Sequence, residues 1–273
     1  MGDFFSDPLS DSLGHLSRKE HFHKVIALHE EPDLTWEFLN SQVPALPRGW
    51  YELSRLPASY RIEFTRDYWL SKIPNTLRDN ENLERRIISF FDELEELGIY
   101  ATQTSPGLPF DVHMVYGLKD AAAFFNGSPP ASLDTINNLE KQFGTISFPR
   151  DYLNFLQIHD GFCKYTDTGL IKTRDMVKTY LKFQQLLGDE VIVAAQGQII
   201  NPSSLIPFYE SYGLHCYQCF FTDWYEGEEM GNVFFSEQEK LMSNFLDANH
   251  LQENMAFPTF LDWLLFYLED GDI

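Results

Sequence analysis

The chain has 273 residues and a formal net charge of −21, with 44% hydrophobic and 15% aromatic residues. The aromatic content excludes a disordered chain, and the length fits one large domain or two ordinary ones. A field of this sign repels phosphate backbones and anionic membranes, so we expect neither nucleic acid nor membrane as a partner. The same field attracts a basic protein partner, although solubility alone also explains it.

The cysteine content and the hydrophobic runs indicate a cytoplasmic protein. Three cysteines, Cys163, Cys216 and Cys219, are too few and odd in number for a disulfide framework, so a reducing compartment is expected. The first residues lack the basic region and apolar stretch of a secretory signal. No run reaches the about 18–20 apolar residues that a membrane helix needs.

The N-terminal part, residues 1–128, is predicted to form a smaller α/β domain. A helix over residues 80–97 has the clearest periodicity, because Leu83, Ile87 and Leu94 lie on one face and Gly98 ends it. The other elements are less regular. In chain order they are a loose segment over 1–20, a helix over 20–42 interrupted at Pro32, an irregular stretch over 43–59, a strand within 60–70, strands over 99–104 and 110–116, and a short helix over 118–125.

A stretch rich in Gly, Ser and Pro at 125–132 separates a second predicted domain, residues 131–270. Ser132 is placed to cap a helix that runs to Gly144, and Pro149 begins a second helix that Gly161 ends. Strands are predicted over 191–194, 205–209, 215–221 and 232–235, and a closing helix over 259–268. This order predicts an α+β fold with an antiparallel-rich sheet covered by helices.

Three groups of residues resemble sites but are interpreted as ordinary structure. Side chains three apart in a strand point to opposite faces, so Cys216 and Cys219 diverge and hold no metal. The histidines near the start are expected to be solvated; they are His15, His21, His23 and His29. The carboxylates of Asp92, Glu93, Glu95 and Glu96 are expected on the wet face of the helix over 80–97.

The usual catalytic fingerprints are missing from the sequence. It has no nucleophile elbow, no phosphate-binding loop and no dinucleotide fingerprint. We therefore expect no catalytic residue, no metal, no cofactor and no enzymatic activity. An undetected enzyme in the N-terminal part remains the weakest of three alternatives.

The best candidate for function is an acidic loop between the third and fourth strands predicted in 131–270. Its residues are Asp223, Trp224, Tyr225, Glu226, Glu228 and Glu229. Aromatic anchors ringed by charge are typical of protein-binding surfaces, so the acids are expected to steer a basic partner and the aromatics to anchor it. The alternative is a simple hairpin connection whose Trp packs into the core.

The C-terminal part resembles a known family. Its opening carries Ile136-x-x-Leu139-Glu140-x-x-Phe143-Gly144, then Phe148-Pro149-x-Asp151-Tyr152-x-x-Phe155-Leu156, and closes on Asp160-Gly161. These residues resemble the signature of the SUKH superfamily, the fungal cell-wall-assembly-regulator family that also includes bacterial toxin-immunity proteins. Phe148 stands where Leu is usual, and Asp160 where Asn is common. Leu205-Ile206-Pro207-Phe208 is similar to a later strand of the family.

The resemblance implies a non-catalytic domain that binds proteins, with Gly144, Pro149 and Gly161 shaping helix ends rather than forming a site. It favours an immunity-like protein that neutralises a basic toxin. The extra residues 1–128 favour the alternative of a regulatory adaptor with two binding domains. The sequence leaves the choice between them open.

Overall fold

The computed structural model describes residues 22–73, 80–119, 124–144, 146–165, 167–188, 191–194, 197–238 and 241–270. The chain divides into two compact units, of which unit 1 comprises Met1–Glu63 and Glu93–Asn126. Unit 2 comprises Phe64–Asp92 and Gly127–Ile273. This division differs in one segment from a simple boundary near residue 130, because residues 64–92 group with the C-terminal unit. The loose segment predicted over 1–20 lies outside the described residues.

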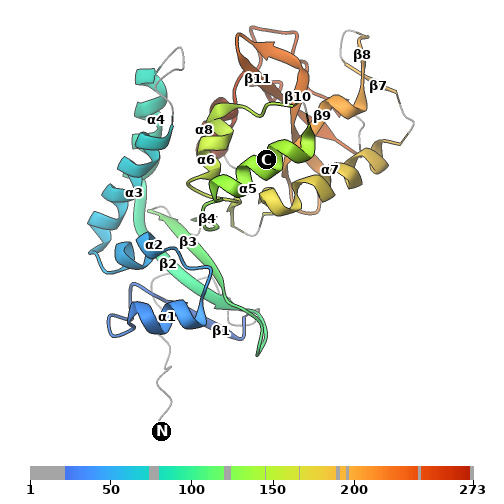
Figure 1. Cartoon of the computed structure of the whole chain (residues 1–273). Coiled ribbons are helices and arrows are strands. Elements are labelled where there is room, and N and C mark those ends of the chain that lie inside the picture. The colour runs from blue at the N-terminus through green and yellow to red at the C-terminus, as the bar shows by residue number, and fades with distance from the viewer. Residues whose placement is uncertain are drawn as a thin grey trace. The chain divides into compact units, whose positions relative to one another are not determined.

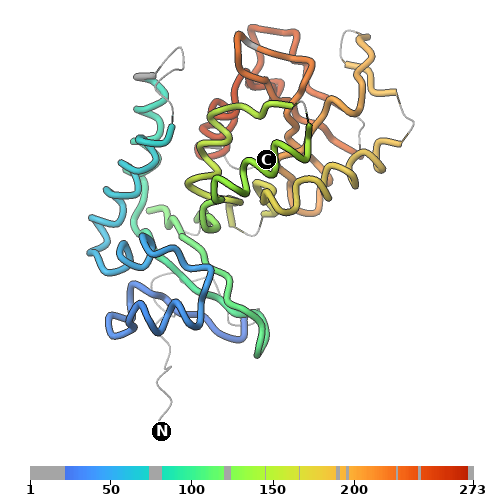
Figure 2. Tube along the Cα trace, viewed as in Figure 1, coloured from blue at the N-terminus to red at the C-terminus, as the bar shows by residue number. Residues whose placement is uncertain are grey.

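Unit 1 is built on three antiparallel strands, β1 (Lys24–Ala27), β2 (Leu94–Gln103) and β3 (Asp111–Leu118), with β2 in the middle. The long β2–β3 ribbon can be followed in Figure 2 and matches the two strands predicted over 99–104 and 110–116. Helices α1 (Trp36–Gln42) and α2 (Arg48–Ser54) bury Leu39 and Trp50, and α2 packs on β2. Thr35 caps α1, because its side chain accepts from the backbone N–H of Phe38.

Several predicted elements of the N-terminal part were wrong. The strand predicted within 60–70 is a helix, α3 (Ala58–Lys72), and the first part of the helix predicted over 20–42 is strand β1. The helix predicted over 80–97 ends early, as α4 (Asn80–Asp92). Its last apolar residues belong instead to β2, where a bulge shifts the register between Leu94 and Glu96. Of the helix predicted over 118–125, residues 120–123 lie outside the described part, and β4 (Phe124–Gly127) follows.

Unit 2 contains an antiparallel sheet in the order β12-β11-β10-β9-β6, with β13 paired to β11. Its long strands are β9 (Leu205–Glu210), β10 (Cys216–Glu226) and β11 (Glu229–Ser236), where strands were predicted. The short strands of this sheet are β6 (Gly169–Leu170), β12 (Leu241–Met242) and β13 (Ala256–Phe257). Strands β5 (Phe162–Lys164), β7 (Ile192–Val193) and β8 (Ile199–Ile200) lie outside it. β7 and β8 form a separate two-stranded sheet.

Helices cover both faces of this sheet. On one face, Tyr152 of α6 (Arg150–Leu156) and Phe260 of α8 (Phe260–Asp270) pack on Phe220 of β10. On the other, Phe183 of α7 (Thr173–Leu187) packs on Tyr217 and Phe235. Helix α5 (Leu133–Phe143) lies beside α7 (Figure 1). The predicted α+β fold is confirmed, whereas α7 was not predicted.

The caps of α5 follow the sequence signals, whereas α6 ends at Leu156, with Gln157 as its C-cap, and not at Gly161 as predicted. Ser132 accepts from the Thr135 N–H at the start of α5, and Gly144, at a φ of 72°, ends it. Pro149 is the N-cap of α6, one position before the predicted one. Among the described residues, no helix is both long and apolar enough to cross a membrane.

Candidate functional site

The acidic segment predicted as a loop is the tip of the β10–β11 hairpin. β10 continues to Glu226, and Gly227 and Glu228 alone connect it to β11. Gly227 has a φ of 71°, a conformation that glycine adopts without steric cost. Asp223 and Glu228 are exposed, Glu229 is half-buried, and the side chain of Glu226 lies outside the described part. The tip therefore presents carboxylates on a short, hydrogen-bonded ribbon.

The two aromatic residues of the tip have different surroundings. Tyr225 is 50% exposed. Trp224 is half-buried, and its ring lies so close over Gly231 that a Cβ there would meet it at 2.3 Å. The Trp224 ring also contacts Phe245, at 5.5 Å between ring centroids. Trp224 thus fastens the hairpin to the core, while Tyr225 is the aromatic side chain available to a partner.

The cysteines of β10 lie in different environments. Cys219 is fully buried within the apolar core beside Phe221 and Val233, and burial raises the pKa of its thiol. Cys216 is half-buried at the start of the strand. In the part of the chain that the structure describes, no group of three or more His, Cys, Asp or Glu residues is placed to hold a metal ion.

Residues 130–264 match the model of the SMI1 / KNR4 family (SUKH-1). These residues belong to that family. No curated protein and no solved structure matches the chain. The match confirms the resemblance of the opening motif, and the SUKH-1 domain contains the sheet of unit 2 and the β10–β11 hairpin.

Two acids of the SUKH-1 opening motif begin later helices of the domain. Asp160 accepts from both the backbone N–H and the hydroxyl of Thr173 at the start of α7, each at 2.7 Å. Asp151 accepts from the Leu261 N–H at the start of α8, at 2.8 Å. Burial raises the pKa of Asp151 to about 7, in spite of this bond and a second one from the Tyr152 N–H. Both carboxylates satisfy helix N-termini, so the motif organises the fold.

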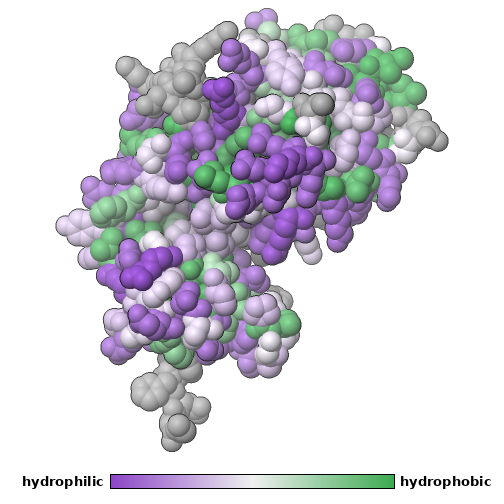
Figure 3. Space-filling view, in the orientation of Figure 1, coloured by the Kyte–Doolittle hydropathy of each residue, from purple (hydrophilic) through white to green (hydrophobic). Residues whose placement is uncertain are grey.

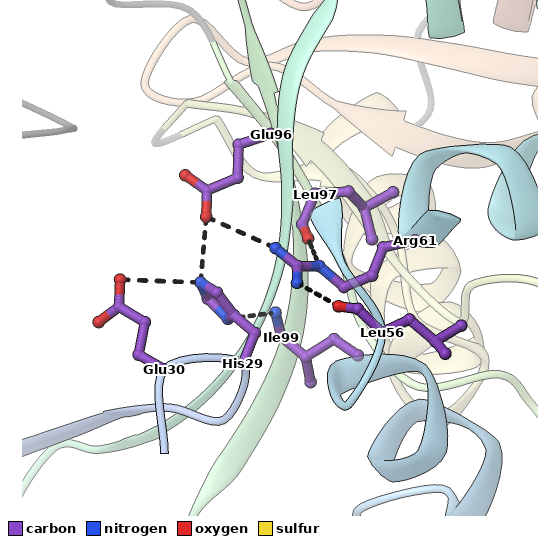
Figure 4. Close-up of polar contacts among 7 residues, drawn as sticks. All are labelled: His29, Glu30, Leu56, Arg61, Glu96, Leu97 and Ile99. Carbon is purple, nitrogen blue, oxygen red and sulfur yellow. Dashed lines mark hydrogen bonds and ion pairs between the residues drawn. The ribbon is translucent and has the colours of Figure 1, made fainter. Parts of the chain in front are cut away.

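Outside the SUKH-1 domain, unit 1 holds a buried polar cluster that the sequence did not reveal (Figure 4). His29 was expected to be solvated and Glu96 to lie on a helix; both predictions were wrong. The His29 side chain is only 4% exposed, and its Nε2 lies 3.1 Å from Glu96 Oε1 on β2. Buried Arg61 lies behind, with its Nη2 3.9 Å from the same oxygen.

A backbone hydrogen bond fixes the tautomer of the His29 ring. The Ile99 N–H donates to His29 Nδ1, so the neutral ring carries its proton on Nε2, facing Glu96. Arg61 donates to the carbonyls of Leu97 and Leu56, at 2.6 and 2.8 Å. The contact with His29 is the main cause that holds the pKa of Glu96 below its usual value. This arrangement ties the turn after β1 and the start of α3 to β2.

Room for the imidazole depends on one glycine. A Cβ at Gly98 would lie 2.7 Å from the His29 ring and 2.6 Å from the Tyr100 ring, whereas one at Gly117 would find nothing nearer than 3.7 Å. We expect Gly98→Ala to destabilise unit 1 by about 1–3 kcal/mol, because the rings must move apart. Gly117→Ala, on the neighbouring strand, should have little effect. Hydrogen exchange of β2 measures the stability of both variants. Equal protection in the two variants would mean that the His29 ring does not need the space left by the missing side chain of Gly98.

Proposed function

We propose that this protein has a non-catalytic role and acts by binding a basic protein through the β10–β11 hairpin of its SUKH-1 domain. The observation that carries the proposal is the composition of the hairpin. Four acids and no basic residue lie between Cys216 and Ser236, and half-exposed Tyr225 stands among them. Acidic rims speed association with basic partners, and a large aromatic side chain supplies contact area at low entropic cost.

A basic toxin is the partner that we favour, which makes the protein immunity-like. The net charge of the chain, −21, supports this choice, because it would neutralise and attract a cationic protein over the Debye length of ~8 Å. Co-expression with candidate basic toxins tests it. Protection from one of them, and loss of protection in the hairpin variants, is the expected result.

The hairpin test separates steering from anchoring. Once a partner is identified, replacing Asp223, Glu226, Glu228 and Glu229 by Ser should slow association by about tenfold at low salt and flatten its salt dependence. Tyr225→Ala should instead speed dissociation, because it removes an exposed aromatic contact. Surface plasmon resonance gives both rates.

Trp224→Ala is the companion variant for the Tyr225 measurement. Its ring covers Gly231 and touches Phe245, so its loss should loosen the hairpin and reduce thermal stability as well as binding. Tyr225→Ala should leave the melting temperature unchanged. If both rates of the acid and Tyr225 variants equal those of the wild type, the interface lies elsewhere on the chain.

A regulatory adaptor is the second candidate. It is favoured by unit 1, which contains strands β1 to β3 and its own buried residues. An adaptor should keep one partner when the other is lost. We expect the hairpin variants of the full chain to release the SUKH-1 partner yet retain a second one in quantitative pull-downs. Loss of every partner together would contradict the adaptor.

A further inference from the structure

Helix α7 (Thr173–Leu187) has an exposed face of unusual charge for this chain. Met176, Phe183 and Leu187 point inward and are buried. Arg174, Lys178 and Lys182 are exposed and recur every four residues, so they form one stripe along the outer face. Leu181, 55% exposed, falls within the same stripe. We call these four residues the α7 stripe.

The charge of the surrounding domain makes the α7 stripe distinctive. Residues 131–273 contain 21 acidic and only 8 basic residues, yet four of those eight lie between Lys172 and Lys182. The only acid in the same span is Asp175, which pairs with Arg174 at 3.4 Å on the surface. Among the residues that the structure describes, none forms an ion pair with Lys178 or Lys182. Two cations therefore face solvent uncompensated in an acidic domain.

We propose that the α7 stripe binds a short acidic segment of a second protein. The three cations span nine residues, about 12 Å along the helix. Two or three carboxylates spaced over that length complement them, and an apolar side chain beside the carboxylates covers Leu181. This surface is separate from the acidic hairpin and has the opposite charge, so the inference goes beyond the proposed function.

A long polyanion fits the α7 stripe less well than a peptide does. Duplex DNA carries about one charge per 1.7 Å, so it would extend from the 12 Å stripe onto the acidic remainder of the chain. A peptide concentrates a few charges where the cations lie. The occupant is therefore an acidic peptide segment rather than a nucleic acid.

The hairpin that follows α7 supplies apolar surface for the same partner. Val191, Val193 and Ile199 of the β7–β8 region are more than half exposed, and Figure 3 shows apolar atoms gathered over these strands. Their neighbours Ile192, Ala194 and Ile200 share one buried cluster with Phe183 and Leu187 of α7. The stripe and the apolar strands thus belong to one packed substructure, which fits a segment that is both acidic and apolar.

The test uses the full chain and a fluorescein-labelled peptide of twelve residues built from Glu-Glu-Leu repeats. A Gln-Gln-Leu peptide of equal length is the uncharged control. We expect fluorescence anisotropy to show binding of the Glu peptide at 50 mM salt, weakening as salt is raised, and at least tenfold weaker binding of the Gln peptide.

Lys178→Glu and Arg150→Glu form a matched pair, because both side chains are exposed in the SUKH-1 domain and both changes add the same negative charge. Lys178→Glu should weaken binding of the Glu peptide about fivefold or more, and Arg150→Glu should weaken it less than twofold. The hairpin variant with four acids replaced by Ser should still bind the peptide. A failure of peptide binding at the α7 stripe can therefore be told apart from a failure of the proposed function of the hairpin.

Other outcomes overturn the proposal. If Lys178→Glu and Arg150→Glu weaken peptide binding equally, then the peptide responds only to the net charge of the chain and not to the α7 stripe. Tighter binding of a twelve-residue oligothymidine than of the Glu peptide, lost in Lys178→Glu, would identify a phosphate-binding surface. Dimers in sedimentation that Lys178→Glu dissociates would identify a second copy as the occupant. No binding of the Glu peptide at millimolar concentration would also refute it.

Discussion

Replacing Trp69 by alanine should destabilise the SUKH-1 domain by about 3–5 kcal/mol, although Trp69 lies outside the matched residues 130–264. Trp69 is fully buried near the end of α3. Its indole contacts Phe155 of α6 at 5.3 Å and Phe162 of β5 at 5.8 Å between ring centroids. Phe90 and Phe91 of α4 also pack on it, at 6.0 and 5.4 Å between ring centroids. Removal of the indole leaves a cavity among these four aromatic side chains.

Phe64→Ala is the control for this prediction, because Phe64 lies on the same helix and is 59% exposed. It should change stability by less than about 0.5 kcal/mol. Hydrogen exchange of peptides from α6 and β5 locates the effect. If α6 keeps its protection in Trp69→Ala, then α3 and α4 are an appendage that the SUKH-1 domain does not need.

Polar contacts also join the α3–α4 segment to the rest of unit 2. Arg86 of α4 makes two charge-assisted hydrogen bonds of 2.6 Å to Glu269 of α8. The Tyr68 hydroxyl donates to the Gln157 carbonyl, and Lys72 donates to the Gln157 side chain. A fragment of residues 131–270 therefore loses part of its core, and a fragment of residues 1–128 exposes Trp69. We therefore expect neither fragment to keep the native fold, and binding is best measured on the full chain.

The sequence predicted elements well where local signals and burial agree. Ser132 and Gly144 bracket α5, and apolar residues line the inner faces of α5 and α8, so these helices were found within one or two residues. Strands β9 to β11 were found because their β-branched and aromatic runs end at turns. In each case the signal lies within the element itself.

Helix α3 was predicted as a strand because its composition is aromatic and β-branched. Tyr60, Phe64 and Tyr68 are exposed, while Trp69 is buried, so apolar residues lie on several sides of the helix and hide its period. Packing of Trp69 on residues nearly a hundred positions away decides the conformation. No local pattern contains that information.

Helix α7 was missed although its signal is present. Met176, Phe183 and Leu187 recur at helical spacing, and Asp160, which caps the helix, stands within the motif that was noticed. The cap acts from thirteen residues away, beyond the reach of the usual N-cap pattern. As a result, the basic stripe of α7 was also overlooked.

The sequence indicated a connection between the strands that became β10 and β11, but it could not place the side chains of that hairpin. Whether Trp224 packs inward depends on Phe245, which is distant in sequence and carries no signal of the contact. The His29–Glu96 pair likewise joins residues far apart in sequence, and the His29 ring occupies space that a side chain at position 98 would fill. Long-range pairs of this kind come from the fold and not from spacing.

His159 should make the SUKH-1 domain sensitive to acid. The side chain is fully buried, and burial lowers its pKa to about 4, against 6.5 for the free side chain. Nδ1 carries the proton of the neutral ring, since it donates to the Ser128 carbonyl at 2.9 Å. Phe162 stacks on the ring, and a Cβ at Gly127 would meet it at 2.3 Å. The cavity is therefore fitted to a neutral imidazole.

The direction of the pH dependence follows from the lowered pKa. The unfolded chain binds a proton at His159 below pH about 6.5, whereas the folded chain resists it until about pH 4. The stabilisation is complete above pH 6.5 and is lost as the pH falls to 4, a loss of about 3 kcal/mol. Asp151 acts in the opposite direction, because its pKa is raised from 3.8 to about 7 in the folded chain. Its contribution to stability is complete below pH 3.8 and is lost as the pH rises to about 7.

These opposite slopes overlap, so the wild type should change little in stability between pH 4 and 6.5, and variants are needed to reveal either group. His159→Asn keeps a donor for the Ser128 carbonyl but cannot titrate. We expect it to be less stable than the wild type at pH 7, and the difference to shrink by about 3 kcal/mol by pH 4. Urea unfolding at five pH values measures the difference in the free energy of unfolding, and hydrogen exchange of α6 locates it.

His250→Gln, at an exposed histidine, is the control, and its free energy of unfolding should follow that of the wild type across the pH range. A constant difference between His159→Asn and wild type across this range would mean that His159 protonates equally in the folded and unfolded chains, and that the buried ring tolerates the charge.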